Sequence, residues 1–212
     1  ATRCDDSSGR QLKIEIPAEI PSADQLGHVY FIGIGGAGLS AIARLMSQQG
    51  ITVSGSDAAE SDVINAPRSE GITCHVGHDA SHLDGVDTVI ASTAVRASNP
   101  EIAEAKRRDL RLWPRSAGLR SAMVGRRTVA VAGTHGKTTT TAMLTCALIE
   151  AGADPSFSIG AEVASLGANA RLGTSDLLIA EADESDGAFL VYSPDGAIVT
   201  NVDADHLDNY GT

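Results

Sequence analysis

TVAVAGTHGKTTTT, residues 128–141, is the stretch from which the class of fold can be worked out. Its β-branched and alanine residues at 128–131 suit a buried strand, the glycine-bounded residues 133–136 form a tight loop, and a helical pattern opens at Lys137. Threonine is a mediocre helix former, so a run of four at the start of a helix needs another reason. A strand, a tight loop and a helix in this order predict a phosphate site, because the N–H groups at a helix N-terminus bind anions.

The side chains of this turn suit the same chemistry. Lys137 adds a point charge for a phosphate, and the hydroxyl of Thr138 can hold Mg²⁺. The spacing departs from the Walker A motif, since the position five before Gly136 is Val131 and the nearest glycine is Gly133. The loop is therefore two residues shorter than that motif requires. A chance GKT in a strand-to-helix turn is the alternative, and the four threonines weaken it.

A second glycine-rich turn lies near the start of the chain. Residues 28–34, HVYFIGI, read as a strand, and GIGGAG at 33–38 satisfies G-x-G-x-x-G before a helical pattern that ends at Gly50. Asp57 stands 19 residues after Gly38, at the end of a second strand, where an acid can accept ribose hydroxyls. The pattern describes a dinucleotide site and equally a nucleotide diphosphate held by the same turn.

The alternation of elements predicts an α/β chain with two sheets. Strands and helices alternate up to Pro114, which predicts a Rossmann-like, doubly wound parallel sheet, and a new sheet begins after Val124. Between the strands expected at 156–159 and 177–180 we expect a loop through Gly173. The predicted division is an N-terminal extension at 1–27, a Rossmann-like domain at 28–124 and a P-loop-type α/β domain at 125–212.

Composition narrows the setting. A net charge of −11 argues against a nucleic-acid surface, because phosphate backbones require basic patches. The three cysteines are odd in number and lack metal-like spacing, which indicates a reducing compartment. No apolar run approaches the ~20 residues of a membrane span and no signal peptide is evident, so we expect a cytoplasmic protein without membrane insertion.

Polar residues crowd the ends of two strands of the second sheet. The strand expected at 177–180 runs into EADESDG at 181–187, and the one at 197–200 runs into NVDADHLD at 201–208. A solvated acidic loop is the ordinary interpretation of such segments. Beside a phosphate loop, a strand-end carboxylate can instead hold Mg²⁺, a hard cation that prefers oxygen ligands and substrate phosphates. The two ends predict a site for phosphoryl transfer.

Three histidines cluster in the first half of the chain, at His75, His78 and His82. Their spacing crosses a strand end and a loop without supporting cysteines or carboxylates, so a metal site is not favoured. His78 as a polar contact to the ligand is the better hypothesis.

These features together resemble the Mur ligases of bacterial cell-wall synthesis. The resemblance runs from Val29 to the C-terminus. His135 separates two branches from most relatives, which carry asparagine there: the branch that adds L-alanine to UDP-N-acetylmuramate and the branch that recycles tripeptide-bearing substrates. Ser185 favours the branch that adds L-alanine. The resemblance implies that 28–124 is a UDP-sugar-binding domain and 125–212 an ATP-binding domain. The family has further central-domain sequence and a third domain, so the ATP-binding domain is expected to be incomplete and the chain to resemble a fragment that is inactive alone. Residues 115–119 depart from the usual RAEML block and leave the hinge unpredicted. The blocks that carry the resemblance are GIGGAGLS (33–40), SGSD (54–57), AGTHGKTTTT (132–141), EADESDGAFL (181–190) and TNVDADHLDNYG (200–211).

The resemblance implies roles for particular residues. The UDP-sugar is expected at Gly35, Gly36, Ala37, Gly38, Leu39, Ser40, Asp57, His78, Ser92, Thr93 and Ala94. ATP is expected at Gly133, Thr134, His135, Gly136, Lys137, Thr138 and Thr139. Mg²⁺ is expected at Thr138, Glu181 and His206, and the catalytic residues are expected to be Lys137, His206, Glu181, His135 and Asn201.

The implied reaction is ATP-dependent amide-bond formation. ATP phosphorylates the lactyl carboxylate of UDP-N-acetylmuramate, and the amine of L-alanine attacks the acyl phosphate, with catalysis by positioning and charge neutralisation. Several alternatives stay open: a UDP-sugar-binding module without turnover, the tripeptide-recycling ligase, an NAD-dependent oxidoreductase built on residues 33–38, and a regulatory P-loop switch. The sequence leaves the oligomeric state and the amino-acid specificity undetermined.

Overall fold

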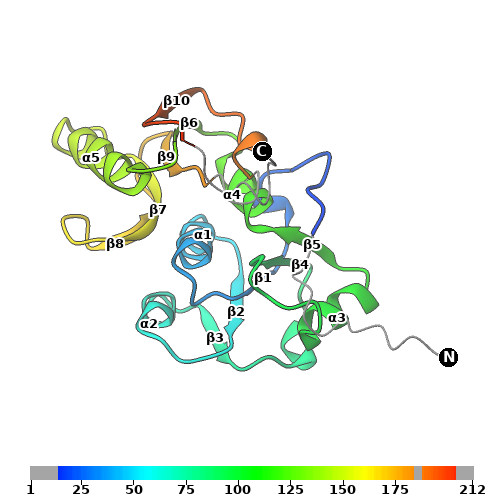
Figure 1. The fold of residues 1–212 in the computed structure, drawn as a ribbon. Helices are drawn as coiled ribbons and strands as arrows, with labels where there is room; N and C mark the ends of the chain where they lie inside the picture. Colours follow the sequence, from blue (N-terminus) through cyan, green and yellow to red (C-terminus); the bar gives the residue numbers. More distant parts are fainter. Residues whose placement is uncertain (1–13, 184–187, 204–212) are drawn as a thin grey trace.

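The chain folds around two five-stranded sheets with helices packed against them (Figure 1). The computed structural model describes residues 14–183 and 188–203. The predicted class, a Rossmann-like parallel sheet followed by a second α/β unit built on a phosphate-type turn, is confirmed. Within these described residues, no helix combines the length and the apolar composition that crossing a bilayer requires.

The first sheet is parallel throughout and has the spatial order β3-β2-β1-β4-β5. Every residue of β1 and β4 is buried, as expected where helices cover both faces of a sheet. The strand order reverses between β1 and β4, so a ligand crevice lies at the carboxyl ends of these two strands. The strands are β1 (Val29–Ile32), β2 (Val53–Asp57), β3 (Thr73–Val76), β4 (Thr88–Ala91) and β5 (Arg111–Pro114).

Helices flank this sheet, and two of their starts matter for the crevice. α1 begins directly after the glycine-rich turn. α3 is capped by Asn99, whose Oδ1 accepts from the N–H of Glu101 at 2.8 Å, with Pro100 at the first helical position. Leu26, before β1, is fully buried and ties the preceding segment to the core. The helices are α1 (Ala37–Gln48), α2 (Asp62–Ser69), α3 (Pro100–Arg107) and the short 3-10 segments η1 (Ala23–Gln25) and η2 (Ala80–Leu83).

The second sheet has the order β10-β6-β9-β7-β8 and is mixed, because β8 runs antiparallel to β7. α5, which opens at Lys137, packs on β7 and β9. The elements are β6 (Arg127–Ala132), α5 (Lys137–Glu150), β7 (Ser156–Val163), β8 (Ala168–Arg171), β9 (Leu177–Glu181), η3 (Ala188–Val191) and β10 (Gly196–Val199).

The hairpin of β7 and β8 replaces the loop that we expected through Gly173. β7 continues past Ile159 to Val163, and β8 returns along it with a register shift between Ser158 and Val163. Residues 160–162 are exposed, so they carry no hydrophobic alternation from which a strand could be predicted. Pairing with β8, and not burial of its side chains, therefore stabilises this end of β7.

α1 lies between the two sheets and joins them (Figure 1). Asn169 of β8 accepts a hydrogen bond from Arg44 at 2.6 Å and donates to the carbonyl of Ala37 at 3.0 Å. The N–H of Leu172 donates to Gln48 at 2.7 Å. α4 (Arg115–Met123) links β5 to β6, so the boundary predicted near Val124 falls between the sheets. The start of α1 is thereby held against the second sheet.

Candidate functional site

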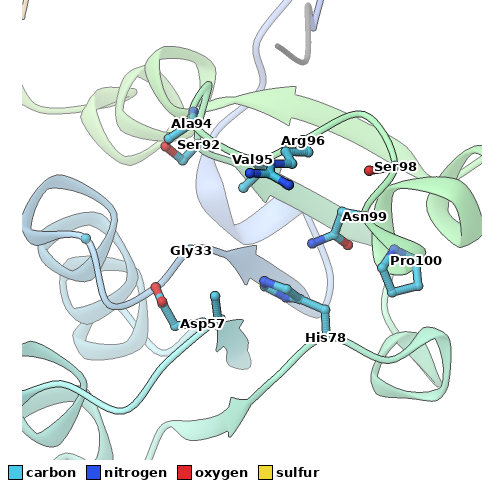
Figure 2. Close-up of a pocket in the computed structure, with 12 residues that line it drawn as sticks. Gly33, Asp57, His78, Ser92, Ala94, Val95, Arg96, Ser98, Asn99 and Pro100 are labelled. Carbon is cyan, nitrogen blue, oxygen red and sulfur yellow. Dashed lines mark hydrogen bonds between the residues drawn. The ribbon is translucent and has the colours of Figure 1, made fainter. Parts of the chain in front are cut away.

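A cavity of about 550 Å³ opens at the carboxyl ends of β1 and β4 (Figure 2). Five residues predicted for the UDP-sugar line it, namely Gly36, Asp57, His78, Ser92 and Ala94. Three residues that the sequence did not single out also line it, namely Arg96, Ser98 and Asn99. Figure 2 shows the ring of His78 reaching from the loop after β3 into the space bounded by Gly33, Asp57 and Asn99. The cavity therefore combines carboxylate, imidazole, amide and guanidinium groups at one crevice.

Asp57 fixes the glycine-rich turn. Its Oδ2 accepts from the N–H of Gly35 at 2.9 Å, and a Cβ added to Gly35 would lie 2.7 Å from that oxygen. A side chain at position 35 would therefore require the turn or the Asp57 carboxylate to shift. The predicted Gly35 and Asp57 are thus brought together, with Asp57 shaping the turn as well as lining the cavity.

Four further residues predicted for the UDP-sugar line a smaller cavity of about 230 Å³, which shares Gly33, Gly36 and Ser92 with the first. The predicted residues on its wall are Gly36, Ala37, Gly38, Leu39, Ser92 and Thr93. Ser40 differs from them: it is 1% exposed, and its hydroxyl has no hydrogen-bond partner within the described part of the chain. Its position behind the turn gives it no surface toward either cavity.

The second phosphate-type turn is held by the strand end after β10. The N–H of His135 donates to Oδ1 of Asn201, and Nδ2 of Asn201 donates to the carbonyl of His135, both at 2.9 Å. Gly133 has φ +129°, and a Cβ there would lie 2.2 Å from the hydroxyl of Thr200. The predicted Gly133, His135 and Asn201 therefore form one loop assembly. Gly136 (φ +81°) ends the loop as the N-cap of α5.

Lys137 and Thr138 are the first two residues of α5, directly after this turn. Nζ of Lys137 donates to the carbonyl oxygens of Gly133 at 2.7 Å and Thr134 at 3.1 Å. The hydroxyl of Thr138 lies 3.0 Å from Oε1 of Glu181, and Thr139 is exposed on the first turn of the helix. The predicted ATP-binding residues are thus collected at one helix N-terminus.

Glu181 and Thr138 supply a pair of oxygen donors suited to Mg²⁺. Glu181 is further oriented by the N–H of Gly160, which donates to its Oε2 at 2.8 Å. The third predicted ligand, His206, lies outside the described residues. Among the residues described, no group of three histidine, cysteine, aspartate or glutamate side chains is placed to hold a metal. The donors present fit a magnesium ion that takes its remaining ligands from phosphates and water.

A third cavity of about 260 Å³ lies between the start of α1 and the end of β9. Gly38 of α1 and Glu181 of β9 line it, and Arg115 and Asp183 lie on its wall. Nη2 of Arg115 is 2.8 Å from Oδ2 of Asp183, and both residues also line the smaller cavity beside the glycine-rich turn. The ion pair of Arg115 and Asp183 therefore lies on the wall of both cavities. Sequence reasoning missed Arg115, although it opens the segment after β5 where the hinge was left unpredicted.

The three histidines gather, but around a carboxylate. The rings of His75 and His82 stack with centroids 4.0 Å apart, and Nδ1 atoms of His78 and His82 each lie 2.9 Å from an oxygen of Glu101. Burial, and then the neighbouring His82, lower the pKa of His75. Sequence reasoning missed Glu101, which lies in a helix of ordinary polar composition.

Two family models match successive parts of the chain. Residues 28–127 match the model described as Mur ligase family, catalytic domain, and residues 131–212 match the Mur ligase middle domain. Among solved structures, the chain is similar to the UDP-N-acetylmuramate-alanine ligase of Thermotoga maritima (TM-score 0.82, 36% identity, 87% of this chain and 44% of that one). It is also similar to the UDP-N-acetylmuramate:L-alanyl-gamma-D-glutamyl-meso-diaminopimelate ligase of Neisseria meningitides (TM-score 0.81, 29% identity, 88% of this chain and 64% of that one).

Curated relatives agree with these matches. A UDP-N-acetylmuramate--L-alanine ligase of a Nocardioides species is 59% identical over 95% of this chain and 45% of the relative. The corresponding protein of Thermobifida fusca is 52% identical over 92% of this chain and 41% of the relative. The chain spans less than half the length of these relatives. The first sheet and its glycine-rich turn thus match the first of two consecutive Mur ligase domains, and the second sheet and its turn match the next. The chain belongs to the Mur ligase family.

Proposed function

We propose that this chain carries the UDP-sugar and ATP sites of a ligase that joins L-alanine to UDP-N-acetylmuramate through an acyl phosphate. One cavity is lined by Gly38 at the start of α1 and by Glu181, whose carboxylate contacts Thr138 at the start of α5, and this arrangement supports transfer between two phosphate-bearing substrates. An oxidoreductase that used the glycine-rich turn alone would leave the second turn without a role. We place the reaction in the cytoplasm, where both substrates are available.

At the first site, the diphosphate lies over the N–H groups at the start of α1, where the helix dipole favours negative charge. Ser92, Thr93 and Ala94 follow β4 and contribute polar and backbone groups to the same crevice. Asp57 and His78 face the uridine, and the lactyl sugar extends toward Arg115. The sugar carboxylate is thereby directed to the second site.

At the second site, Lys137 leaves its carbonyl partners and binds the β- and γ-phosphates of ATP. Thr138 and Glu181, with His206, hold magnesium, which neutralises phosphate charge when bound. Asn201 and His135 keep the loop in the shape that fits the phosphates. The protein contribution is positioning and charge stabilisation.

The chemistry follows from the poor leaving ability of a carboxylate oxygen. An oxygen of the lactyl carboxylate attacks the γ-phosphorus, the bond to the β-phosphate oxygen breaks, and ADP leaves. The amine of L-alanine then attacks the acyl carbon, loses a proton, and inorganic phosphate departs with the former carboxylate oxygen. Exclusion of water between the two sites protects the acyl phosphate from hydrolysis.

The tripeptide-recycling reaction is the second candidate. Among the solved structures, the one named for alanine addition is 36% identical to this chain, and the one named for the L-alanyl-gamma-D-glutamyl-meso-diaminopimelate substrate is 29% identical. This difference favours alanine as the amine substrate.

One experiment tests the assignment. The full-length protein is mixed with UDP-N-acetylmuramate, ATP and equal amounts of L-alanine and the tripeptide, and the masses of the products are measured by mass spectrometry. The expected product carries one alanine residue, with ADP formed in equal amount. Calorimetry with each ligand is run beside it: binding of the UDP-sugar without any product would support a binding module without turnover and would contradict ligation by this chain.

A further inference from the structure

Glu101 is a fully buried carboxylate at the base of the nucleotide cavity. Its side chain is 0% exposed, and it occupies the second position of α3, where Asn99 caps its N–H. A buried carboxylate is costly unless hydrogen bonds and an opposite charge compensate it. The contacts of this group therefore show what keeps it in place.

Four side chains surround the two oxygens of Glu101. Oε1 accepts from the hydroxyl of Tyr30 at 2.8 Å and lies 2.9 Å from Nδ1 of His82. Oε2 accepts from the hydroxyl of Ser56 at 2.7 Å and lies 2.9 Å from Nδ1 of His78. Burial raises the pKa of Tyr30 well above its usual range, so its hydroxyl remains a donor. Both carboxylate oxygens are thus fully engaged.

The ion-pair partners of Glu101 within the described part of the chain are His78 and His82, and neither lysine nor arginine pairs with it there. Nδ1 of each imidazole faces an acceptor and so carries a proton. For His78 this leaves Nε2 for the cavity, since that nitrogen has no hydrogen-bond partner among residues 14–183 and 188–203. Figure 2 shows this ring directed into the cavity.

We propose that Glu101 is a positioning residue for nucleotide binding: it fixes the proton of His78 on Nδ1 and thereby presents Nε2 to the nucleoside part of the ligand. This rests on the proposed function, which places a uridine diphosphate in the cavity. His82 and the ring of His75 stacked on it hold the opposite side of the carboxylate, so Glu101 cannot turn away from His78. Glu101 acts through His78 and does not touch the ligand itself.

The test is a double-mutant cycle on UDP affinity, measured by calorimetry. Glu101→Gln keeps the shape of the side chain but removes its charge and replaces one carboxylate oxygen, an acceptor, by an NH₂ donor. His78→Asn keeps a donor near the position of Nδ1 and removes Nε2. Each single change is expected to weaken UDP binding about tenfold, as for one lost hydrogen bond to a charged or well-ordered group. The double variant is expected to bind no more weakly than His78→Asn alone, because both changes remove the same contact.

Glu104→Gln, on the same helix and paired with Arg107 and Arg108, is the matched control and is expected to bind UDP like the unaltered chain. Unchanged affinity of Glu101→Gln, or multiplied losses in the double variant, would overturn the proposal. The ¹⁵N spectrum of neutral His78 gives a second readout that needs no variant: a proton on Nε2 instead of Nδ1 would also overturn it. If the unaltered chain binds no UDP, the nucleotide site of the proposed function fails first.

Discussion

Thr138 and Glu181, 43 residues apart in the chain, meet across neighbouring parallel strands, with the threonine hydroxyl 3.0 Å from Oε1 and 3.1 Å from Oε2 of the carboxylate. β6 and β9 pair in register, so the helix after one strand and the last residue of the other arrive at the same edge. Gly160 of β7 completes the arrangement by donating its N–H to Glu181. Three adjacent strands thus position the hydroxyl and the carboxylate that we propose as magnesium ligands.

Glu181→Gln is expected to abolish the dependence of ATP binding on Mg²⁺. The amide keeps the size of the side chain but loses the charge that a hard cation requires. Turnover should fall on the order of 100-fold or more, because metal stabilisation of the transferring phosphoryl group amounts to several kcal/mol. Calorimetry of ATP at several Mg²⁺ concentrations measures the effect, with the exposed Glu162→Gln as control. Equal Mg²⁺ dependence in both variants would contradict the assignment.

Lys137→Ala is expected to abolish ADP release in the presence of UDP-N-acetylmuramate and ATP. The lysine is the cation at the second turn, and its loss leaves the β- and γ-phosphates without that charge. Affinity for the UDP-sugar should remain within twofold, since the first cavity is lined by other residues. A coupled assay of ADP and calorimetry of the UDP-sugar separate the two effects. Normal ADP release from the variant would rule out this role.

Local units of this fold could be predicted because their signals are local. Each glycine-rich turn follows a buried strand and precedes a helical pattern; α1 begins inside its turn, at Ala37, and α5 begins directly after Gly136. The meeting of Thr138 with Glu181 could also be predicted, because the carboxyl ends of parallel strands share one edge of a sheet.

Other features depend on contacts between distant segments. α3 reads PEIAEAKR, which is typical of a solvent-exposed helix, and nothing in that pattern indicates that Glu101 is buried while Glu104 faces its arginines. Arg115 meets Asp183 only because α4 and the end of β9 converge. The β7–β8 hairpin was missed for a related reason: its outer half is exposed and is formed by pairing. Such placement is decided by tertiary contact and not by residue type.

Gly35→Ala is expected to lower both stability and UDP affinity. The added Cβ would lie 2.7 Å from Oδ2 of Asp57, so either the turn or the carboxylate must shift. Overpacking of this kind costs about 1–3 kcal/mol of unfolding free energy. Urea unfolding and calorimetry measure the two effects. Gly196→Ala is the control, because its Cβ would make only an ordinary contact of 3.7 Å with Val129; equal behaviour of the two variants would contradict the close-approach argument.

Glu104 is expected to contribute to the acid sensitivity of the fold. Hydrogen bonds from Arg107 and Arg108 lower the pKa of Glu104 from 4.5 to about 2. Because the folded pKa is lower than the unfolded one, the contribution is present above pH 4.5 and is lost as the pH falls toward 2. Glu104→Gln should therefore show a shallower decline of unfolding free energy across that window, measured by urea titration at each pH. Parallel curves for the variant and the unaltered chain would exclude this contribution.

Arg96→Ala is expected to weaken UDP binding about tenfold, as for one charge-assisted contact to a phosphate. Arg96 is an exposed cation on the wall of the nucleotide cavity, in a chain of net charge −11 that must attract its anionic ligand locally. The dependence of affinity on salt should also become shallower, since one screened charge pair is lost. Arg107→Ala, on the outer side of α3, is the matched control and should leave affinity unchanged.

Uridine without phosphates separates the role of Arg96 from a general disturbance of the cavity. Calorimetry with uridine should give the same affinity for the Arg96→Ala variant and the unaltered chain, because the guanidinium is assigned to the diphosphate. An equal loss for uridine and UDP would show that Arg96 acts on the nucleoside or on the shape of the loop after β4. In that case the charge of Arg96 would not contribute to diphosphate binding, and the glycine-rich turn would hold the diphosphate without it.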